Sequence, residues 1–324
     1  MAKAKKIVGI DCAGRAADAV PLVLRPRFEE MCRLRERALD FSDPEGVHDM
    51  RVASRRLRSA IRDSMPYLRK TKLSAPARQL KEIADKLGEV RDDDVAIIAL
   101  EKLQKKLSGE VSSGLQRIID AQKAEREIAR TELTSTMSSS AISELEPAFL
   151  EAIGASVTPA AAPPTKTRPA KKSGSGYKVF ARAALLRRLK ELERLSTSLY
   201  EPHEVKPLHE MRMAAKRLRY ALDLFGHCWG ESLEVFSRQV AKLQTSLGEL
   251  HDCDVWIEHF GKRLRRVKTK PGEQATPPDE RDAMIWLLSH FTRLRTKHFR
   301  AALARWHEWE SKDFCNRLTA TLRT

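Results

Sequence analysis

The sequence predicts an all-α protein made of two domains, each a bundle of about four helices. Three observations lead to this fold class. Long stretches rich in Ala, Leu, Arg, Lys and Glu carry apolar residues at intervals of three and four, the period of amphipathic helices, and no segment is typical of a strand. The 324 residues, with 42% hydrophobic content, are enough for two domains that each bury a core. Finally, two motifs occur twice along the chain.

These motifs form an internal repeat. The segment VHDMRVASRRLRSAI at 47–61 corresponds in charge and polarity to LHEMRMAAKRLRYAL at 208–222. In the same way, RQLKEIADKLGEVRDDDVA at 78–96 corresponds to RQVAKLQTSLGELHDCDVW at 238–256. The offsets are 161 and 160 residues, so the intervening segments differ in length by one residue. A duplicated domain explains this spacing.

Each half is expected to hold one helix before the first motif, one for each motif, and a long final helix. The second helix of the first half has a clear start signal, because Ser42 and Asp43 precede Pro44 and a capping-box residue, Glu45. Pro207 is expected to mark the corresponding start in the second half.

Composition marks the predicted boundaries. A stretch rich in Pro, Ala, Ser and Gly is typical of an interdomain linker, and a shorter break at 268–280 separates two late helices. We therefore predict an N-terminal tail at 1–16, a first helical repeat at 17–153, a linker at 154–177 and a second helical repeat at 178–324.

The net charge points to an acidic partner. The chain has 60 Lys and Arg against 44 Asp and Glu, a net charge of +16 that is large enough to attract polyanions from a distance. A ribosome- or DNA-associated protein, or simply a soluble basic surface, also fits this charge. Aromatic residues make up only 6% of the chain, which disfavours proposals based on stacking of exposed bases.

The cysteines and the hydropathy predict a cytoplasmic protein. The five cysteines are odd in number and form no CxxC pair, which argues against a disulfide framework and a zinc site, and favours a reducing compartment. No apolar run is long enough to cross a bilayer, and the N-terminal stretch lacks the apolar core of a signal peptide. The cysteines are Cys12, Cys32, Cys228, Cys253 and Cys315.

The first repeated motif predicts a basic stripe along a helix. At about 100° per residue, its cationic side chains fall within one arc of roughly 80°, with the apolar side chains elsewhere. In the first half no acidic residue shares that arc, whereas in the second half Asp223 takes the position of Arg62. Like charges at this spacing repel by about 0.2–0.5 kcal/mol per pair. A solvated face, or pairing with carboxylates of a neighbouring helix, are the alternatives. The stripe residues are His48, Arg51, Arg55, Arg58 and Arg62 in the first half and His209, Arg212, Lys216 and Arg219 in the second.

The final helices repeat this pattern. The same spacing recurs as His290, Arg293, Lys297 and Arg300, and a shorter version as Lys123, Arg126 and Arg130. Two helices of each bundle are therefore expected to direct cations at one groove. A groove of this kind suits a flexible polyanion, because each contact contributes only roughly 0.5–1 kcal/mol. A ligand that makes about ten such contacts at once reaches micromolar affinity. Such binding weakens steeply with salt.

The second motif supplies supporting residues. Asp92 and Asp252 are expected to hold stripe arginines in position or to cap a helix, rather than to bind a metal, because acidic metal sites normally need more carboxylates. Gly88 and Gly248 are expected to permit close helix packing or a break.

The His-Asp pairs raise the alternative of an enzyme. His48-Asp49 and His251-Asp252 are typical of metal-dependent phosphohydrolases, but neither pair is kept in both halves. A phosphoacceptor role for a histidine stays open, although an imidazole that donates to phosphate or orients an arginine fits better. Because the sequence also lacks a Gly-rich phosphate loop, a GxSxG elbow and an HExxH helix, we predict no catalytic residue, metal or cofactor.

The paired motifs resemble those of the CHAD domain, the conserved histidine α-helical domain, over about residues 17–320. This resemblance implies two four-helix bundles related by pseudo-twofold symmetry around a basic central cavity, which binds inorganic polyphosphate. It also implies that the two stripes line the cavity, with Arg91 and Asp92 beside them. In the second half His251 replaces Arg91 and Lys216 replaces Arg55, so weaker binding is expected there.

The predicted function is therefore non-enzymatic binding of inorganic polyphosphate, with association to polyphosphate granules and their proteins. The first alternative is a basic protein that binds nucleic acid without sequence specificity, for which the charge fits but no groove-reading helix is visible. The second is an enzyme of phosphate metabolism that uses His48 or His209.

Overall fold

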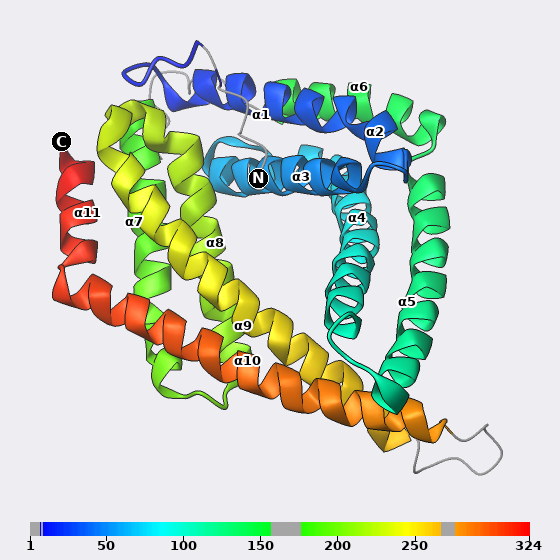
Figure 1. Cartoon of the computed structure of the whole chain (residues 1–324). Helices are drawn as coiled ribbons and strands as arrows, with labels where there is room; N and C mark the ends of the chain where they lie inside the picture. The colour runs from blue at the N-terminus through cyan, green and yellow to red at the C-terminus, as the bar shows by residue number, and fades with distance from the viewer. Residues whose placement is uncertain (1–6, 8, 157–175, 267–275) are drawn as a thin grey trace. The chain divides into compact units, whose positions relative to one another are not determined.

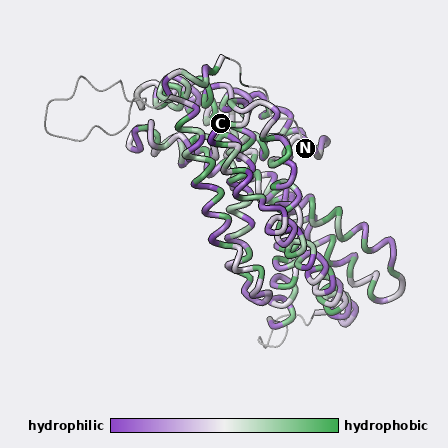
Figure 2. The backbone as a smooth tube through the Cα atoms, turned by 90° about the vertical axis from the view of Figure 1, so that its left-hand side faces the viewer, coloured by the Kyte–Doolittle hydropathy of each residue, from purple (hydrophilic) through white to green (hydrophobic). Residues whose placement is uncertain are grey.

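The computed structural model of the chain is all-helical, as predicted (Figure 1). It describes residues 7, 9–156, 176–266 and 276–324. Within these ranges, strand-like pairing is limited to one isolated bridge between Arg15 and Gly176. Hydrophilic and hydrophobic positions alternate along each helix in Figure 2, as amphipathic helices require.

Among the described residues, the first half of the sequence contains six α-helices and the second half five, more than the four expected in each half. The first expected helix is interrupted at Leu34, and each long final helix is followed by another. The first-half elements are α1 (Ala16–Arg33), α2 (Arg35–Leu39), α3 (Pro44–Ser64), η1 (Met65–Tyr67), α4 (Lys70–Gln104), α5 (Gly109–Thr136) and α6 (Ser139–Ser156). The second-half elements are α7 (Tyr177–Arg194), η2 (Ser196–Tyr200), α8 (Val205–Phe225), η3 (Gly226–Leu233), α9 (Glu234–Arg266), α10 (Pro278–Ser311) and α11 (Phe314–Arg323).

Helix α3 starts where the sequence predicts. Asp43 is the N-cap residue, its side chain accepts a hydrogen bond from the Glu45 amide at 2.9 Å, and Pro44 occupies the first helical position. Helix α8 begins at Val205, which puts Pro207 in its first turn.

Most of the predicted linker and of the late break lies outside the described residues. Helix α6 continues through Gly154 to Ser156, and α7 begins at Tyr177. No helix in the described part of the chain is long and apolar enough to span a bilayer.

The described residues divide into two compact units. The first comprises residues within 1–94, 126–185 and 223–228, and the second comprises residues within 95–125, 186–222 and 229–324. Each unit therefore contains segments from both halves of the sequence. The domain boundaries predicted at 17–153 and 178–324 describe a different division and stay a prediction.

In the first unit, α1 packs against α3 and α6. Phe28 of α1 stacks on Phe149 of α6 with ring centroids 4.3 Å apart, and both rings are fully buried. Met50 and Leu57 of α3 are fully buried as well. This packing turns the basic side of α3 away from the core.

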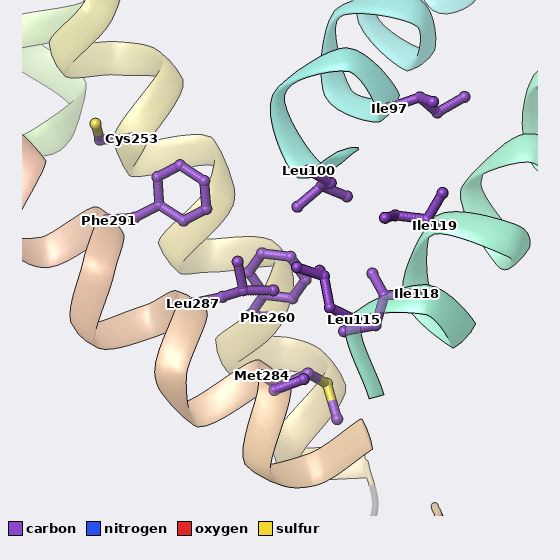
Figure 3. Close-up of a cluster of buried hydrophobic side chains, with 11 residues drawn as sticks. Ile97, Leu100, Leu115, Ile118, Ile119, Cys253, Phe260, Met284, Leu287 and Phe291 are labelled. Atoms are coloured by element: carbon purple, nitrogen blue, oxygen red, sulfur yellow. The ribbon is translucent and has the colours of Figure 1, made fainter. Parts of the chain in front are cut away.

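In the second unit, the end of α4 and the start of α5 join α9 and α10 in one hydrophobic core (Figure 3). A Cβ added at Gly114 would lie 2.0 Å from the Asp279 carbonyl oxygen, so only glycine permits this approach between the starts of α5 and α10. The core residues are Ile97, Leu100, Leu115, Ile118, Ile119, Cys253, Phe260, Ala283, Met284, Leu287 and Phe291.

Candidate functional site

The first group of predicted site residues gathers between α3 and α4, within the first unit. We call it the α3–α4 cluster; it consists of His48, Arg51, Arg55, Arg58 and Arg91. All five side chains are partly exposed. His48 lies close enough to Arg91 and Arg55 for both positive charges to lower its pKa, after the larger effect of burial.

Carboxylates of α4 engage two of these arginines. Arg51 pairs with Asp92 at 2.9 Å and Arg58 with Asp85 at 3.9 Å. The stripe has no acidic residue in its own arc of α3, but it has acidic neighbours on the next helix, one of the predicted alternatives. Because the Asp92 side chain is 69% exposed, water screens this pair and its contribution to stability is small.

The second group gathers between α8 and α9, within the second unit. We call it the α8–α9 cluster; it consists of His209, Arg212, Lys216, Arg219 and His251. The Nδ1 atoms of His209 and His251 lie 3.1 Å apart. Arg219 donates a hydrogen bond to the Gln244 Oε1 atom at 3.1 Å.

The surroundings of both histidines in this cluster favour the neutral ring. Burial first, then the neighbouring Arg212 charge, lowers the pKa of His251 to about 4. The pKa of His209 is also lowered, by burial and then by Arg212 and Lys216. In a neutral pair only one of the facing Nδ1 atoms carries a proton, so one ring donates to the other. An anion bound here would favour the charged form of both rings.

The glycines of the second motif lie beside these arginines. A Cβ placed on Gly88 would be 3.9 Å from Arg51 Nε, and one placed on Gly248 would be 3.9 Å from Arg212 Nε. Helices α4 and α9 run through these glycines without a break. Of the two predicted roles, the break is therefore wrong. At 3.9 Å an added Cβ would make only ordinary van der Waals contact with the arginine side chains, so the close-packing role stays a prediction.

The predicted stripe of α5 meets a different face of α4. Arg126 and Arg130 each lie 3.5 Å from Asp94, which is buried. At 100° per residue, Asp94 is about 200° around the helix from Asp92. The structure thus brings these arginines to the side of α4 opposite Arg51 rather than to the α3–α4 cluster. Lys123 pairs with Glu101 at 2.8 Å.

The predicted stripe of α10 also lies apart from its cluster. Arg295 pairs with the buried Asp254 at 2.5 Å, which defines the side of α10 that faces α9. Arg293 and Lys297 are each about 200° from Arg295 around the helix, so they lie on the opposite side, where both are exposed. His290 stacks on Trp286 at 5.1 Å, and Arg300 is exposed. Arg62 is exposed as well, and donates to Ser59 Oγ.

Sequence reasoning missed the buried aspartates that pair with arginines of α5 and α10 and so set which side of each helix faces its neighbour. Asp94 and Asp254 occupy equivalent positions of the repeated motif, 160 residues apart. Both are buried and both receive arginines from the following helix. Two aspartates that are two positions apart on a helix point to nearly opposite sides of it. This spacing was the signal that one of them faces a second neighbouring helix.

Two partly buried ion triads were missed as well. Arg27 pairs with Glu30 at 2.8 Å, and Arg56 approaches the same carboxylate at 3.8 Å. In the second half, Glu191 pairs with Arg188 at 3.1 Å and with Arg217 at 2.5 Å. Each of the three positions recurs after 161 residues, the offset of the first motif.

The prediction drawn from the cysteine spacings is wrong. Cys12 and Cys228 form a disulfide across a sequence separation of 216 residues, which no local spacing could indicate. The inference of a reducing compartment loses its support. Cys32, Cys253 and Cys315 are free thiols, and burial is the main cause that raises the pKa of each to about 12.

Two groups in the described residues have the composition of a metal site. One is Cys12, His227 and Cys228, and the other is Glu45, His48 and Asp49. In the second group Asp49 already pairs with Arg37 at 2.7 Å.

Two curated relatives share about a quarter of their aligned residues with this chain. Two uncharacterized proteins of Mycobacterium tuberculosis, from strains H37Rv and CDC 1551, are 26% and 25% identical to this chain over 247 residues. The alignments cover 75% of this chain and 45% of each relative. The chain thus spans about half the length of the curated relatives it matches.

Solved structures with a similar fold cover nearly the whole chain. The crystal structure of the CHAD domain from the plant Ricinus communis has a TM-score of 0.69 at 19% identity, and covers 93% of this chain and 95% of its own. PptA from Streptomyces chartreusis has a TM-score of 0.63 at 16% identity, and covers 91% of this chain and 100% of its own. The CHAD domain family itself matches residues 22–261. The resemblance drawn from the motifs is thereby confirmed, and the chain belongs to the CHAD domain family.

Proposed function

We propose that this protein binds inorganic polyphosphate without catalysis, through the α3–α4 cluster and the α8–α9 cluster. One observation carries the proposal: each unit holds a histidine and a column of cations on one helix, beside a glycine of the next helix. Arginine binds phosphate oxygens in a bidentate geometry, and partly exposed side chains keep this geometry accessible.

A chain of phosphates fits these clusters better than a single compact anion. No single charge is deeply buried, so each contact is worth only about 0–1 kcal/mol and affinity depends on their number. A flexible polymer engages several cations at once and, when both clusters hold the same chain, gains from effective concentration.

The histidines act as adjustable donors in this proposal. A neutral imidazole still has one N–H group for a phosphate oxygen, and a protonated one has two. Because His48, His209 and His251 all have lowered pKa values in the unliganded protein, bound phosphate raises these values and draws protons into the site.

We infer further that the chain arose by internal duplication and that the two repeats are related by pseudo-twofold symmetry about a basic central cavity. The triads around Glu30 and Glu191 support the duplication, because charged side chains seldom recur by chance with both the same partners and the same offset. The pairs formed by Asp94 and Asp254 support it in the same way.

Binding of this kind would recruit the protein to polyphosphate granules in the cytoplasm, where granule proteins are its expected neighbours. Nucleic acid competes for the same charge. Polyphosphate has one negative charge for nearly every repeat unit and no bulky sugar or base, so it fits closely spaced cations better.

The decisive variant combines Arg51→Glu, Arg55→Glu, Arg212→Glu and Lys216→Glu. We expect it to lose long-chain polyphosphate binding, measured by fluorescence anisotropy at physiological salt, while circular dichroism shows intact helices. A matched control reverses the same number of exposed cations near the ends of other helical stretches, at Lys70, Lys72, Lys190 and Arg238.

Two outcomes would contradict the proposal. One is unchanged polyphosphate binding by the folded cluster variant, and the other is an equal loss in the control, which would mean that total charge alone decides. Equal affinity of the native protein for double-stranded DNA or RNA, at equal phosphate, would favour the nucleic-acid alternative instead.

A further inference from the structure

A site outside both clusters combines two cysteines with a histidine. Cys12, Cys228 and His227 each present a ligand atom, and these atoms all lie within 4.8 Å of one another. All three residues belong to the first unit. The polyphosphate proposal uses none of them.

Backbone contacts hold Cys12 in place independently of its disulfide. The Cys12 carbonyl accepts a hydrogen bond from the Lys178 amide at 2.9 Å, and the Gly14 carbonyl accepts one from the Tyr177 amide at 2.7 Å. The Asp11 side chain accepts from the Ala13 amide at 2.9 Å and closes the turn. The short segment before α1 therefore stays beside the start of α7 when the sulfur–sulfur bond is absent.

Packing holds the other two ligands in the same way. His227 and Cys228 lie in η3, which begins one residue after Phe225, the buried last residue of α8. The Tyr177 ring lies 5.9 Å from Phe225 and stacks on His227 at 5.8 Å. Tyr177 thus links both sides of the site, since its amide holds the Cys12 segment and its ring supports the histidine.

The hydrogen bonding of His227 leaves one nitrogen suited to a metal. Its Nδ1 atom lies 3.0 Å from the Leu224 carbonyl oxygen, which can only accept, so Nδ1 carries the proton. The lone pair is then on Nε2. Metal-binding histidines commonly donate their second N–H to a backbone carbonyl in this manner, which fixes the tautomer and the ring orientation.

We propose that Cys12, Cys228 and His227 form a binding site for a thiophilic divalent metal ion, with Zn²⁺ as the type ligand, when the cysteines are reduced. Two thiolates and one imidazole supply three of the four tetrahedral ligands of zinc, and water takes the fourth position. The site is then occupied either by the metal or by the disulfide, but not by both.

The chemistry of sulfur makes the two states exclusive. A cysteine binds Zn²⁺ as a thiolate, with a Zn–S bond of about 2.3 Å. In the disulfide each sulfur is bonded to the other, so neither is a thiolate.

The chemistry balances in both directions. A dithiol reductant supplies two electrons and two protons, which convert the disulfide to two thiols while the reductant becomes a disulfide itself. Zn²⁺ then displaces both thiol protons to solvent as two Zn–S bonds form. Oxidation by a small-molecule disulfide removes two electrons from the thiolates, reforms the sulfur–sulfur bond and releases the metal.

The test uses the full chain with Cys32→Ser, Cys253→Ser and Cys315→Ser, so that the paired cysteines are the only thiols. This protein is reduced with a dithiol under argon, freed of reductant and titrated with Co²⁺, with Zn²⁺ as competitor. We expect one equivalent to bind with thiolate-to-cobalt charge-transfer absorption, and Zn²⁺ to raise the melting temperature. The oxidised protein should show neither signal.

Adding Cys228→Ser or His227→Gln to that background should weaken metal binding by at least about 10-fold. Circular dichroism checks that each variant is folded. The proposal is overturned if the reduced background protein binds no Co²⁺, or if either added substitution leaves its affinity unchanged. No phosphate ligand enters these measurements, so their outcome is independent of the polyphosphate proposal.

Discussion

The α3–α4 cluster and the α8–α9 cluster have the same layout but differ in charge. In the first, carboxylates of α4 approach two of the four arginines, Arg51 and Arg58. In the second, Arg219 contacts the neutral Gln244, and two facing histidines occupy the positions of His48 and Arg91. Both clusters therefore carry permanent positive charge, but His251 gives the second a charge that depends on pH at the position where the first has Arg91.

This difference changes what the substitutions in the second half mean. From the sequence, Lys216 and His251 predict weaker binding in that half. The structure adds that His251 lies against His209, so the α8–α9 cluster gains charge whenever the pair takes up a proton. Its strength relative to the α3–α4 cluster is then a function of pH. The following experiments test the comparison, from the largest expected effect to the smallest.

The largest effect is expected at the triads behind the clusters. Glu30→Gln leaves Arg27 and Arg56 without their shared carboxylate in a site nearly closed to water, and should lower the free energy of unfolding by about 2–4 kcal/mol. Glu191→Gln should lower it less, because the Glu191 side chain is 23% exposed against 16% for Glu30. Urea denaturation measures both.

The exposed neighbour Glu29 supplies the control, since Glu29→Gln should change stability by less than about 0.5 kcal/mol. If only one of the two triad variants is destabilised, the inference of an internal duplication is contradicted.

The next effect compares the clusters directly. Arg51→Ala, Arg55→Ala and Arg58→Ala together should weaken polyphosphate binding by about 10- to 100-fold at pH 8, as three contacts of about 0.5–1 kcal/mol are lost. The corresponding variant of Arg212, Lys216 and Arg219 should lose less at that pH. Anisotropy titrations over a salt series measure affinity and show a shallower salt dependence in both variants. A larger loss from the second set at pH 8 would reverse the comparison.

A smaller effect concerns pH. The pKa of His251 is about 4 in the free protein, and bound phosphate raises it, so affinity should increase by about 2- to 5-fold as pH falls from 8 to 6. His251→Arg copies the first half and should flatten this profile, whereas Arg91→His should steepen it. Calorimetry in buffers of different ionisation enthalpy counts the protons taken up. An unchanged profile in His251→Arg would remove the histidine pair from the site.

The same histidine affects the unliganded fold in the opposite direction. Its folded pKa of about 4 lies below the unfolded value near 6.5, so the unfolded chain binds more protons between these pH values. The contribution of His251 to stability is complete above about pH 6.5 and is lost as pH falls toward 4. Polyphosphate should oppose that loss, which thermal melts at pH 7 and pH 5 with and without ligand would show.

The smallest effect is expected at the exposed stripe of α10. Arg293→Ala, Lys297→Ala and Arg300→Ala should change affinity by less than about 2-fold at physiological salt, because charges beyond a Debye length of about 8 Å are largely screened. Their position on the side of α10 opposite α9 is the reason for this expectation. A 10-fold loss in the same anisotropy assay would return the stripe to the binding site.

The sequence was informative wherever one helix decides the outcome. The periodicity predicted the helices, Asp43 and Pro44 predicted the start of α3, and the repeat predicted the stripes on α3 and α8. It was not informative where the outcome depends on which helix packs against a given face. A helical wheel shows that Arg126 and Arg130 share a face, but not that this face meets Asp94. The Cys12–Cys228 disulfide was invisible for the same reason, since only the fold brings these residues together.

The shared core of the second unit determines which fragments of this protein can be made. Cutting the chain between α6 and α7 would leave Leu100 and Leu115 in water on one piece, and would uncover Phe260 and Leu287 on the other. Each piece would then expose an apolar surface that is complementary to the apolar surface of the other piece. Expressed alone, either should aggregate, whereas both made in one cell should be recovered together. A fragment of this protein is therefore expected to stay in solution only if it keeps this core intact.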